Sequence, residues 1–312
     1  MLILKLPENS RTGTSYSQHQ TMKAISIGCF AHHRLKQTQF AEVTSIFNRS
    51  LYLDLKGDWI CLADAELGRS PITINIGHKY AKGWLHRFKI GRLVEISPFS
   101  ISLDNCPIIS VEKLHPWRPE KPPKWSKTAL KRGLDALLYH SKGKIPSEGL
   151  GCFIFSSQKR KLRSLESIAA DWPIKVLENW LINSLEASIP LPLDNRSVTS
   201  LLGLGPGLTP SGDDFLGGML IALQALEKVE MRNQLFFHIR NQFKNTGPVS
   251  RAHLKAAATG EGHDVIHRLL NALMKGGETQ ISLAVEKIRL LGHTSGWDTI
   301  SGLVTVIRKT AS

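Results

Sequence analysis

Short apolar runs and alternating positions dominate the chain from residue 23 to residue 115. Ser50–Leu55 alternates between polar and apolar side chains, while residues 59–62 and 72–76 form short apolar runs. Alternation places every second side chain on one face of a strand, and short apolar runs are typical of buried strands. Gly57 and Asp58, between two of these segments, are typical of a hairpin turn. The pattern predicts a small sheet or barrel.

Beyond residue 166 the apolar positions recur at helical spacing, most clearly over residues 265–273. Glycines such as Gly260 and Gly276 follow the last apolar positions, as is typical of helix C-termini. The predicted helices cover residues 171–188, 197–202, 212–227, 232–244, 248–259, 264–275, 280–291 and 295–309. A further helix is predicted over residues 126–140, before this region.

The two patterns divide the chain into domains. Residues 115–127 contain four prolines and are predicted to form a crossing linker, because proline lacks a backbone donor and interrupts regular structure. The apolar segment 150–155 is a candidate last strand. The predicted fold is α+β, with a small N-terminal β-sheet or barrel domain followed by an all-helical C-terminal domain. The predicted divisions are a disordered tail (1–22), a β-rich basic domain (23–115), a linker with a helix and the candidate strand (116–165), and a helical domain with a Gly-rich loop (166–312).

Charge is distributed unevenly between the two halves. Residues 1–165 hold 26 Lys and Arg against 12 Asp and Glu, whereas residues 166–312 hold 14 of each. A basic half can neutralise nucleic-acid phosphates, but no known reader motif organises its basic clusters, so nucleic-acid binding is disfavoured. A solvated surface, a docking face for an acidic partner subunit and steering of an anionic substrate stay open. The basic clusters and the tryptophans among them are Arg87, Lys89, Arg92, Lys121, Lys124, Lys127, Lys131, Arg132, Lys159, Arg160, Lys161, Arg163, Trp84, Trp117 and Trp125.

The cysteines and the apolar segments indicate a cytoplasmic protein. The four cysteines are dozens of residues apart without a CxxC pair, which is typical of free thiols in a reducing compartment. The apolar run Met1–Leu4 is too short for the core of a signal peptide, and no segment approaches the length of a membrane span.

Two serine-led segments eighty-four positions apart share one pattern. Ser211, Gly212, Asp214 and Gly218 have the same spacing as Ser295, Gly296, Asp298 and Gly302. Each segment is predicted to begin a helix, because a serine hydroxyl can accept from free first-turn amides and a carboxylate complements the helix dipole. Either copy alone is also typical of a helix that binds nothing. The repetition predicts a single site built from both helix beginnings.

The segment before Ser211 is unusually rich in glycine and proline. Gly203, Gly205, Gly207 and Gly212 alternate with Pro206 and Pro210. Glycine permits positive φ and proline restricts the remaining path, so the loop is predicted to be rigid and its amides able to converge on an anion. The segment lacks the Lys of a P-loop and the GxSxG pattern of a hydrolase, which disfavours a standard NTPase or hydrolase.

The acidic residues restrict the kind of ligand. A carboxylate about 4 Å from a phosphate opposes it by roughly 4 kcal/mol at an effective dielectric of 20. Either a divalent cation such as Mg²⁺ bridges Asp213, Asp214 or Asp298 to the anion, or the carboxylates accept from the N–H groups of a carbamoyl or amide ligand. His263 and His267 have the spacing of a metal pair but no HExxH motif, and are predicted to lie on the surface.

The C-terminal region resembles the AllH-like family, named for a subunit of bacterial oxamate carbamoyltransferase. Residues 205–211 with Asp213 and Asp214 are similar to the first family signature, and residues 291–296 with Asp298 and Gly302 to the second. The residues similar to the middle helix of the family are Val249, Ser250, Leu254, Ala257, Ala258 and Gly260. The resemblance covers residues 195–310. It implies carbamoyl transfer between oxalurate and phosphate, giving oxamate and carbamoyl phosphate in anaerobic allantoin breakdown, with AllG-like and FdrA-like partner subunits.

The residues and the resemblance together define a candidate site for a small anionic carbamoyl, carboxylate or phosphate ligand. The predicted catalytic residues are Asp213, Asp214, Asp298 and His293. The predicted ligand-binding residues are Gly205, Gly207, Thr209, Ser211, Gly212, Ser250, Thr294, Ser295 and Gly296. Asp213 and Asp214 are the candidate ligands if a metal is bound, and His293 is a candidate for proton transfer. A non-catalytic scaffold or assembly subunit is the main alternative, followed by a basic nucleic-acid-binding protein.

Overall fold

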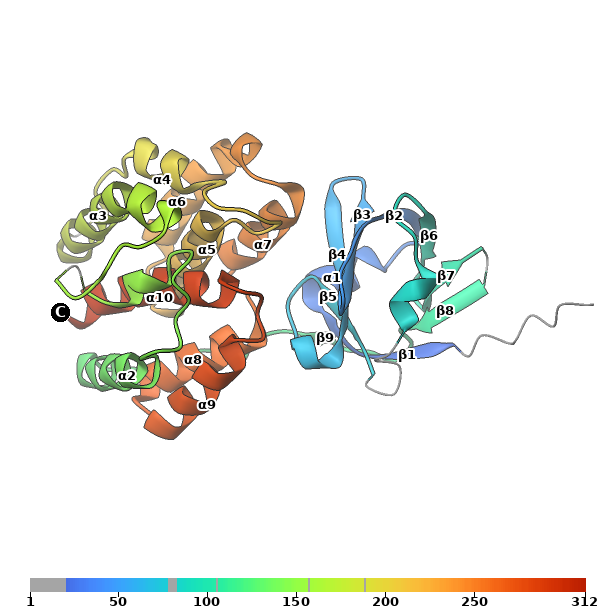
Figure 1. The fold of residues 1–312 in the computed structure, drawn as a ribbon, viewed down its shortest axis with the longest axis horizontal. Helices are drawn as coiled ribbons and strands as arrows, with labels where there is room; N and C mark the ends of the chain where they lie inside the picture. The colour runs from blue at the N-terminus through green and yellow to red at the C-terminus, as the bar shows by residue number, and fades with distance from the viewer. Residues whose placement is uncertain (1–20, 78–82, 105, 157, 188) are drawn as a thin grey trace, which may run out of the picture.

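The computed structural model describes residues 21–312, apart from 78–82, 105, 157 and 188. The predicted tail therefore lies almost wholly outside the described residues. The strands are β1 (Met22–Gly28), β2 (Gln39–Ile46), β3 (Ser50–Leu55), β4 (Asp58–Asp64), β5 (Thr73–Ile76), β6 (Leu93–Ile96), β7 (Ser100–Leu103), β8 (Cys106–Ser110) and β9 (Pro116–Trp117). Neighbours follow the order β5-β4-β3-β2-β6-β7-β8-β1, and β1 also pairs with β5. These eight strands close into a barrel (Figure 1). The two-residue strand β9 pairs with β1 in parallel.

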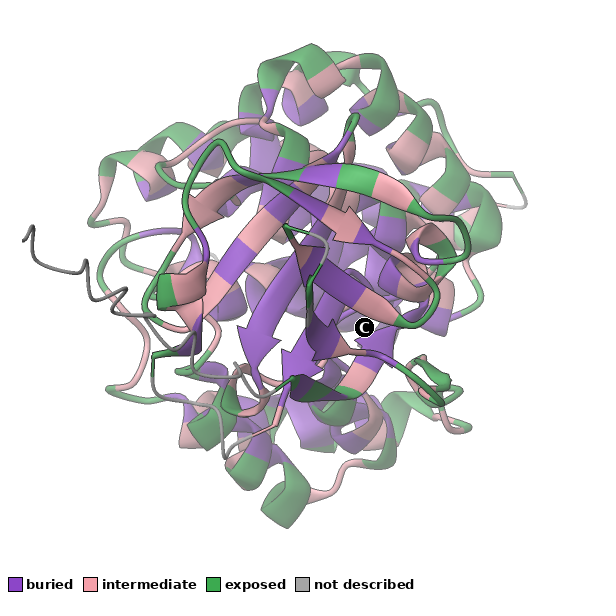
Figure 2. Cartoon of the chain, turned by 90° about the vertical axis from the view of Figure 1, so that its right-hand side faces the viewer, coloured by how far each residue is buried: buried purple, intermediate pink, exposed green. Residues whose placement is uncertain are grey.

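Alternation along the strands fills the interior of the barrel. Leu51, Leu53 and Leu55 of β3 are at most 4% exposed and belong to the barrel core, together with Ile60 and Leu62 of β4. Figure 2 shows buried residues concentrated on these strands when the barrel end is viewed. Residues 56 and 57 both adopt positive φ between β3 and β4, which matches a tight hairpin turn. The predicted barrel is confirmed.

The second region is helical and lies beside the barrel (Figure 1). The α-helices are α1 (Cys29–Arg34) within the barrel region, then α2 (Lys127–His140), α3 (Leu165–Glu186), α4 (Asn195–Leu201), α5 (Ser211–Ala225), α6 (Val229–Asn241), α7 (Pro248–Ala258), α8 (Asp264–Lys275), α9 (Glu278–Ile288) and α10 (Ser295–Ala311). The 3-10 helices are η1 (Ala65–Leu67), η3 (Trp84–Arg87), η4 (Gly151–Ile154) and η5 (Phe243–Asn245). One apolar core joins α2 to the later helices. Within the described residues, no helix is both long enough and apolar enough to span a membrane.

Three local predictions differ from the structure. The candidate strand at 150–155 is wrong, because residues 151–154 form a 3-10 turn whose apolar side chains pack into the helical core. Helix α3 begins at Leu165, six residues before the predicted start, since Ser164 and Ser167 form a capping box and Pro173 is tolerated inside the helix. The linker is also not wholly irregular, because Pro116 and Trp117 pair with β1.

Candidate ligand site between the barrel and the helices

A cavity of about 1170 Å³ lies between the barrel and the helical region. Strands β3, β4 and β5 line one side, and the other side is lined by residues 206–209, the N-termini of α5 and α10, and α7. Binding pockets for small molecules typically measure about 300 to 1,000 Å³. This cavity is therefore large enough to hold two small substrates together.

Helices α5 and α10 cross at equivalent glycines of the repeated pattern. A Cβ atom on Gly218 would lie 1.9 Å from the carbonyl oxygen of Thr299, and one on Gly302 would lie 1.8 Å from that of Phe215. Thr299 and Phe215 are themselves eighty-four positions apart, so the two contacts are related by a local two-fold arrangement. Only glycine lets the two backbones touch in this way.

Serine and aspartate side chains interact between the two helices. The hydroxyl of Ser295 lies at the carboxyl group of Asp214, and the hydroxyl of Ser211 lies at that of Asp298. Thr209 adds a hydroxyl contact of 3.1 Å to Ser295. The structure thus brings the two serine-led segments together at one side of the cavity.

The capping role predicted for the two serines is wrong. Pro210 and Thr294 occupy the N-cap positions, and neither makes a side-chain capping hydrogen bond within the described part of the chain. Ser211 and Ser295 are the first helical residues instead. Each hydroxyl instead interacts with the aspartate of the opposite helix, because the close crossing of the helices at the two glycines brings that carboxyl group within reach.

Asp298 is a buried residue behind the cavity surface. Its side chain is 0% exposed, its Oδ1 accepts from the backbone N–H of Leu150 at 2.6 Å, and its Oδ2 has no partner among the described residues. Burial raises the pKa of Asp298 to about 6, although the Leu150 N–H and the side chains of Ser211 and Thr294 oppose the shift. A proton therefore binds to this carboxyl far more readily than to an ordinary aspartate.

Asp214 is one of the acidic residues that line the cavity. Its Oδ2 is buried and has no hydrogen-bond partner in the described residues, although the side chain as a whole is only half-buried. Burial raises the pKa of Asp214 well above its usual range, and the nearby charge of Asp298 raises it further. The hydroxyls of Ser295 and Thr209 oppose the shift. A protonated Asp214 can donate a hydrogen bond, so the repulsion of anions expected from ionised carboxylates is weakened.

Asp213 is occupied by hydrogen bonds that hold the loop. Its Oδ1 accepts from the Gly203 N–H at 2.8 Å, and its Oδ2 accepts from the hydroxyls of Thr246 and, at 2.5 Å, Ser250. The side chain is 2% exposed, and burial raises its pKa against these three bonds. No group of three or more His, Cys, Asp or Glu side chains in the described residues could hold a metal ion. Metal binding by Asp213 would require it to release these donors.

The remaining predicted residues divide into two groups. Those that line the cavity are Gly207, Thr209, Ser211, Ser250, His293, Thr294, Ser295 and Gly296. Gly205 and Gly212 are not among the described residues that line it, and they shape the loop instead, since a Cβ atom on Gly212 would lie 1.9 Å from the Leu201 carbonyl oxygen. His293 lies at the exposed rim, with its Nε2 3.3 Å from Glu148.

The histidine of α8 differs from its predicted place. His267 is 7% exposed, and its Nε2 accepts from the Gly262 N–H at 3.0 Å, so the predicted surface position is wrong. Burial, followed by the charge of His263, lowers the pKa of both His253 and His267 to about 4. Both rings are therefore neutral near pH 7. His253 and His263 line the cavity at the end formed by α7 and α8.

The barrel wall of the cavity was missed by sequence reasoning. Tyr52, Cys61 and Thr73 line it from β3, β4 and β5. One signal was present in the sequence. Residues 59–63 lack the alternation of a half-exposed strand, and a strand that is buried on both faces must be covered by another part of the protein on its outer face.

The position of Trp84 does not suit binding of a nucleic acid. Its side chain is 4% exposed and donates a hydrogen bond to Asp64, so it is not free to stack on a base.

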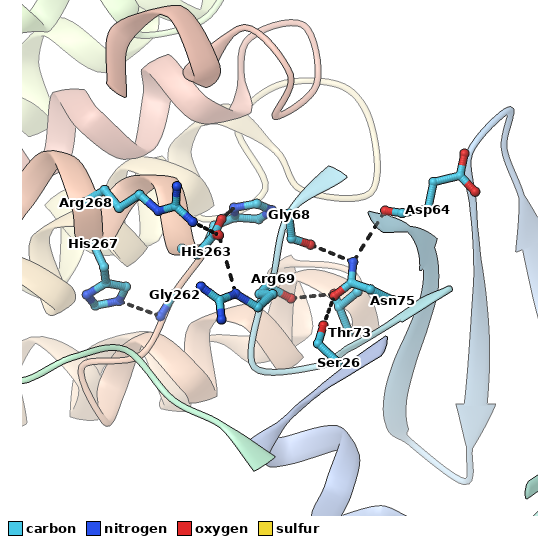
Figure 3. Close-up of polar contacts among 12 residues, drawn as sticks. Ser26, Asp64, Gly68, Arg69, Thr73, Asn75, Gly262, His263, His267 and Arg268 are labelled. Carbon is cyan, nitrogen blue, oxygen red and sulfur yellow. Dashed lines mark hydrogen bonds and ion pairs between the residues drawn. The ribbon is translucent and has the colours of Figure 1, made fainter. Parts of the chain in front are cut away.

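Polar contacts hold the barrel against α8. Arg69 accepts from the backbone N–H of Asp264 at 2.8 Å through its carbonyl oxygen, and its guanidinium lies 3.6 Å from the Asp264 carboxylate. Arg268 contacts the same carboxylate at 3.0 Å (Figure 3). Asn75 donates to the Gly68 carbonyl oxygen at 2.8 Å and accepts from Ser26 at 2.6 Å, which stiffens the contacting loop. The cavity is thus bounded by two regions that are tied together.

Comparison with known proteins agrees with the resemblance found in the sequence. Residues 201–307 match the family model described as oxamate carbamoyltransferase subunit AllH. The matched segment runs from the end of α4 into α10 and includes both serine-led segments. No solved structure matches the chain.

Proposed function

We propose that this chain is a carbamoyltransferase subunit that binds a small carbamoyl ligand at the crossed N-termini of α5 and α10. The observation that carries the proposal is the buried, unpartnered Oδ2 of Asp214 at the wall of a cavity that Ser211 and Ser295 also line. Serine hydroxyls can donate to a ligand oxygen, and a carboxyl group suits a carbamoyl nitrogen.

The proposed reaction is carbamoyl transfer from oxalurate to phosphate. A phosphate oxygen attacks the carbamoyl carbon of oxalurate, the bond from that carbon to the oxamate nitrogen breaks, and carbamoyl phosphate and oxamate are released. The proton of the attacking hydrogen phosphate ends on the oxamate nitrogen. A carboxyl group with a raised pKa can give a proton to the leaving nitrogen and recover it from phosphate, which is the role proposed for Asp214.

Each neighbouring residue has a proposed supporting role. Asp298 is a positioning residue that helps to keep Asp214 protonated, since the negative charge of Asp298 raises the pKa of Asp214. Asp213 holds the loop through Gly203, Thr246 and Ser250. Proton transfer by His293 and a bridging Mg²⁺ remain predictions, to be tested by the His293→Ala variant and by titration with and without the cation.

The test is ligand binding by the Asp214→Asn variant, with Asp135→Asn as the matched control. Asp135 is an exposed residue of α2, outside the cavity. Calorimetric titration with carbamoyl phosphate, oxamate and phosphate should show binding to the wild type and to Asp135→Asn. Asp214→Asn should weaken it about 100-fold or more, because the O–H of the protonated carboxyl is lost from a buried site and is replaced by an amide with different hydrogen-bonding geometry. Unchanged affinity in Asp214→Asn would contradict the proposal.

A non-catalytic assembly subunit is the second candidate function. The observation that favours it is that Phe47, Leu208 and Leu290 are exposed by 37 to 48% and all line the cavity, so apolar surface remains for a partner to cover. AllG-like and FdrA-like subunits are the proposed partners. In that case Asp214→Asn would leave small-ligand affinity unchanged, while a Leu290→Asp variant would prevent assembly with them.

A further inference from the structure

Three side chains form a row across the outer face of the barrel, beside the cavity. Tyr52 on β3 pairs with Cys61 on β4, and Cys61 pairs with Thr73 on β5. The residues that flank Tyr52, Leu51 and Leu53, are 0% exposed and belong to the barrel core. Because side chains alternate along a strand, the row must point out of the barrel, and all three members line the cavity.

The phenol of Tyr52 and the carboxyl group of Asp214 line the same cavity. Burial raises the pKa of Tyr52 well above its usual value, and interactions with Cys61 and with the carboxyl group of Asp214 raise it further. Phe47 packs edge-on against the Tyr52 ring at a centroid distance of 6.2 Å, which restrains the direction of the phenol. The phenol therefore remains protonated, and hence a hydrogen-bond donor, throughout the pH range in which the site would work.

The neighbours of the phenol within the row leave it available to a ligand. The Cys61 sulfur interacts with the side chains of both Tyr52 and Thr73, but sulfur is a weak hydrogen-bond acceptor. The hydroxyl of Thr73 already lies 2.6 Å from that of Ser70. An anionic oxygen entering the cavity would be a much stronger acceptor for the phenol than the sulfur is.

We propose that the barrel forms the second wall of the ligand site and that Tyr52 donates a hydrogen bond to an anionic oxygen of the ligand. The inference rests on the proposed function, because the same ligand is held at Asp214 by its carbamoyl or amide end. The helical wall carries Asp213 and Asp214, whereas the row on the barrel wall carries neutral donors. The ligand class is thus a small carboxylate or phosphate that also bears a carbamoyl or amide group, with its anionic end turned toward the barrel.

The test compares Tyr52→Phe with Tyr139→Phe, which removes a phenol from an exposed position of α2. Both substitutions keep the aromatic ring, and their thermal melting temperatures should stay within a few degrees of the wild type. Calorimetric titration of the full chain with oxamate, carbamoyl phosphate and inorganic phosphate should show affinity reduced about tenfold or more in Tyr52→Phe, because a hydrogen bond to a charged group is lost. Tyr139→Phe should remain within about twofold of the wild type.

The outcomes separate the inference from the function on which it rests. Weakened binding in Tyr52→Phe with unchanged Tyr139→Phe supports the inference. Equal affinity of Tyr52→Phe and the wild type, with Asp214→Asn still impaired, would overturn the role of Tyr52 and leave the proposed function standing. If the wild type binds none of the three anions, both the proposed function and the role of Tyr52 are overturned.

Discussion

The two serine-led segments share one geometry and differ in how each aspartate is used. Gly218 and Gly302 make equivalent backbone contacts, and each serine lies at the aspartate of the other helix. Asp214 lines the cavity, whereas Asp298 is fully buried and accepts from the Leu150 N–H. The same local pattern has therefore produced a cavity-facing carboxyl in one copy and a supporting one in the other.

The difference arises from what packs against each copy. The first copy has an additional acid, Asp213, which holds the Gly-rich loop, while the equivalent position of the second copy is the buried Trp297. The segment before η4 covers the second copy, since Gly149 is so close that a Cβ atom on it would lie 2.6 Å from Asp298 Oδ1. A repeated sequence thus yields an asymmetric site once different segments cover its two halves.

The largest expected effect tests the symmetry itself. Gly218→Ala and Gly302→Ala should each destabilise the fold by about 4 kcal/mol or more, because the new methyl group overlaps a helix carbonyl that cannot move without separating α5 from α10. Urea unfolding measures the loss. Gly217→Ala is the matched control, since its Cβ atom would meet Ala257 at an ordinary 3.8 Å. Equal stability of Gly217→Ala and Gly218→Ala would contradict the close crossing.

The next effect concerns the acid found only in the first copy. Asp213→Ala should destabilise the protein by roughly 3 to 5 kcal/mol, because it leaves the Gly203 N–H and the hydroxyls of Thr246 and Ser250 buried without their acceptor. Chemical denaturation at pH 7 measures this. Ser250→Ala, which removes one of the three donors, should cost only about 1 kcal/mol. A loss of ligand binding without loss of stability in Asp213→Ala would instead indicate direct contact with the ligand.

The pH dependence of stability should expose the buried acid of the second copy. Because the pKa of Asp298 rises from 3.8 to about 6 on folding, the folded state binds its proton more tightly than the unfolded state. The stabilisation of the folded state by this proton is fully present below pH 4 and is lost as the pH rises through about 6. The loss in the free energy of unfolding is at most about 3 kcal/mol. Unfolding free energies of the wild type and Asp298→Asn between pH 4 and pH 7 isolate the change. Parallel pH profiles would contradict a raised pKa.

The smallest effect is expected at the rim of the cavity. His293→Ala should leave the melting temperature unchanged within error, because the side chain is 75% exposed and its contact with Glu148 is screened by solvent. Turnover in carbamoyl transfer and ligand affinity of His293→Ala, measured separately, distinguish a role in proton transfer from a position at the rim without such a role. A large loss of turnover with unchanged ligand affinity would favour proton transfer by His293.

The sequence by itself determined the elements and the existence of a repeat. Alternation over Ser50–Leu55 predicted a strand, helical spacing over 265–273 predicted α8, and the shared spacing from Ser211 and Ser295 predicted two related helix beginnings. These signals are local, because side-chain alternation and helical periodicity are properties of a few consecutive residues. They were sufficient for the barrel, the helical region and the part of the cavity lining that comes from the two serine-led segments.

Only the tertiary structure decided which side chains meet. The serines reach the aspartates of the opposite helices, Asp213 accepts the hydrogen bonds that hold the Gly-rich loop, and Tyr52, 162 positions before Asp214 in the chain, lines the same cavity. His267 carries a polar side chain at a position that its sequence neighbours did not identify as buried. Such contacts depend on how distant segments pack, and packing sets burial, which in turn sets the protonation of each carboxyl.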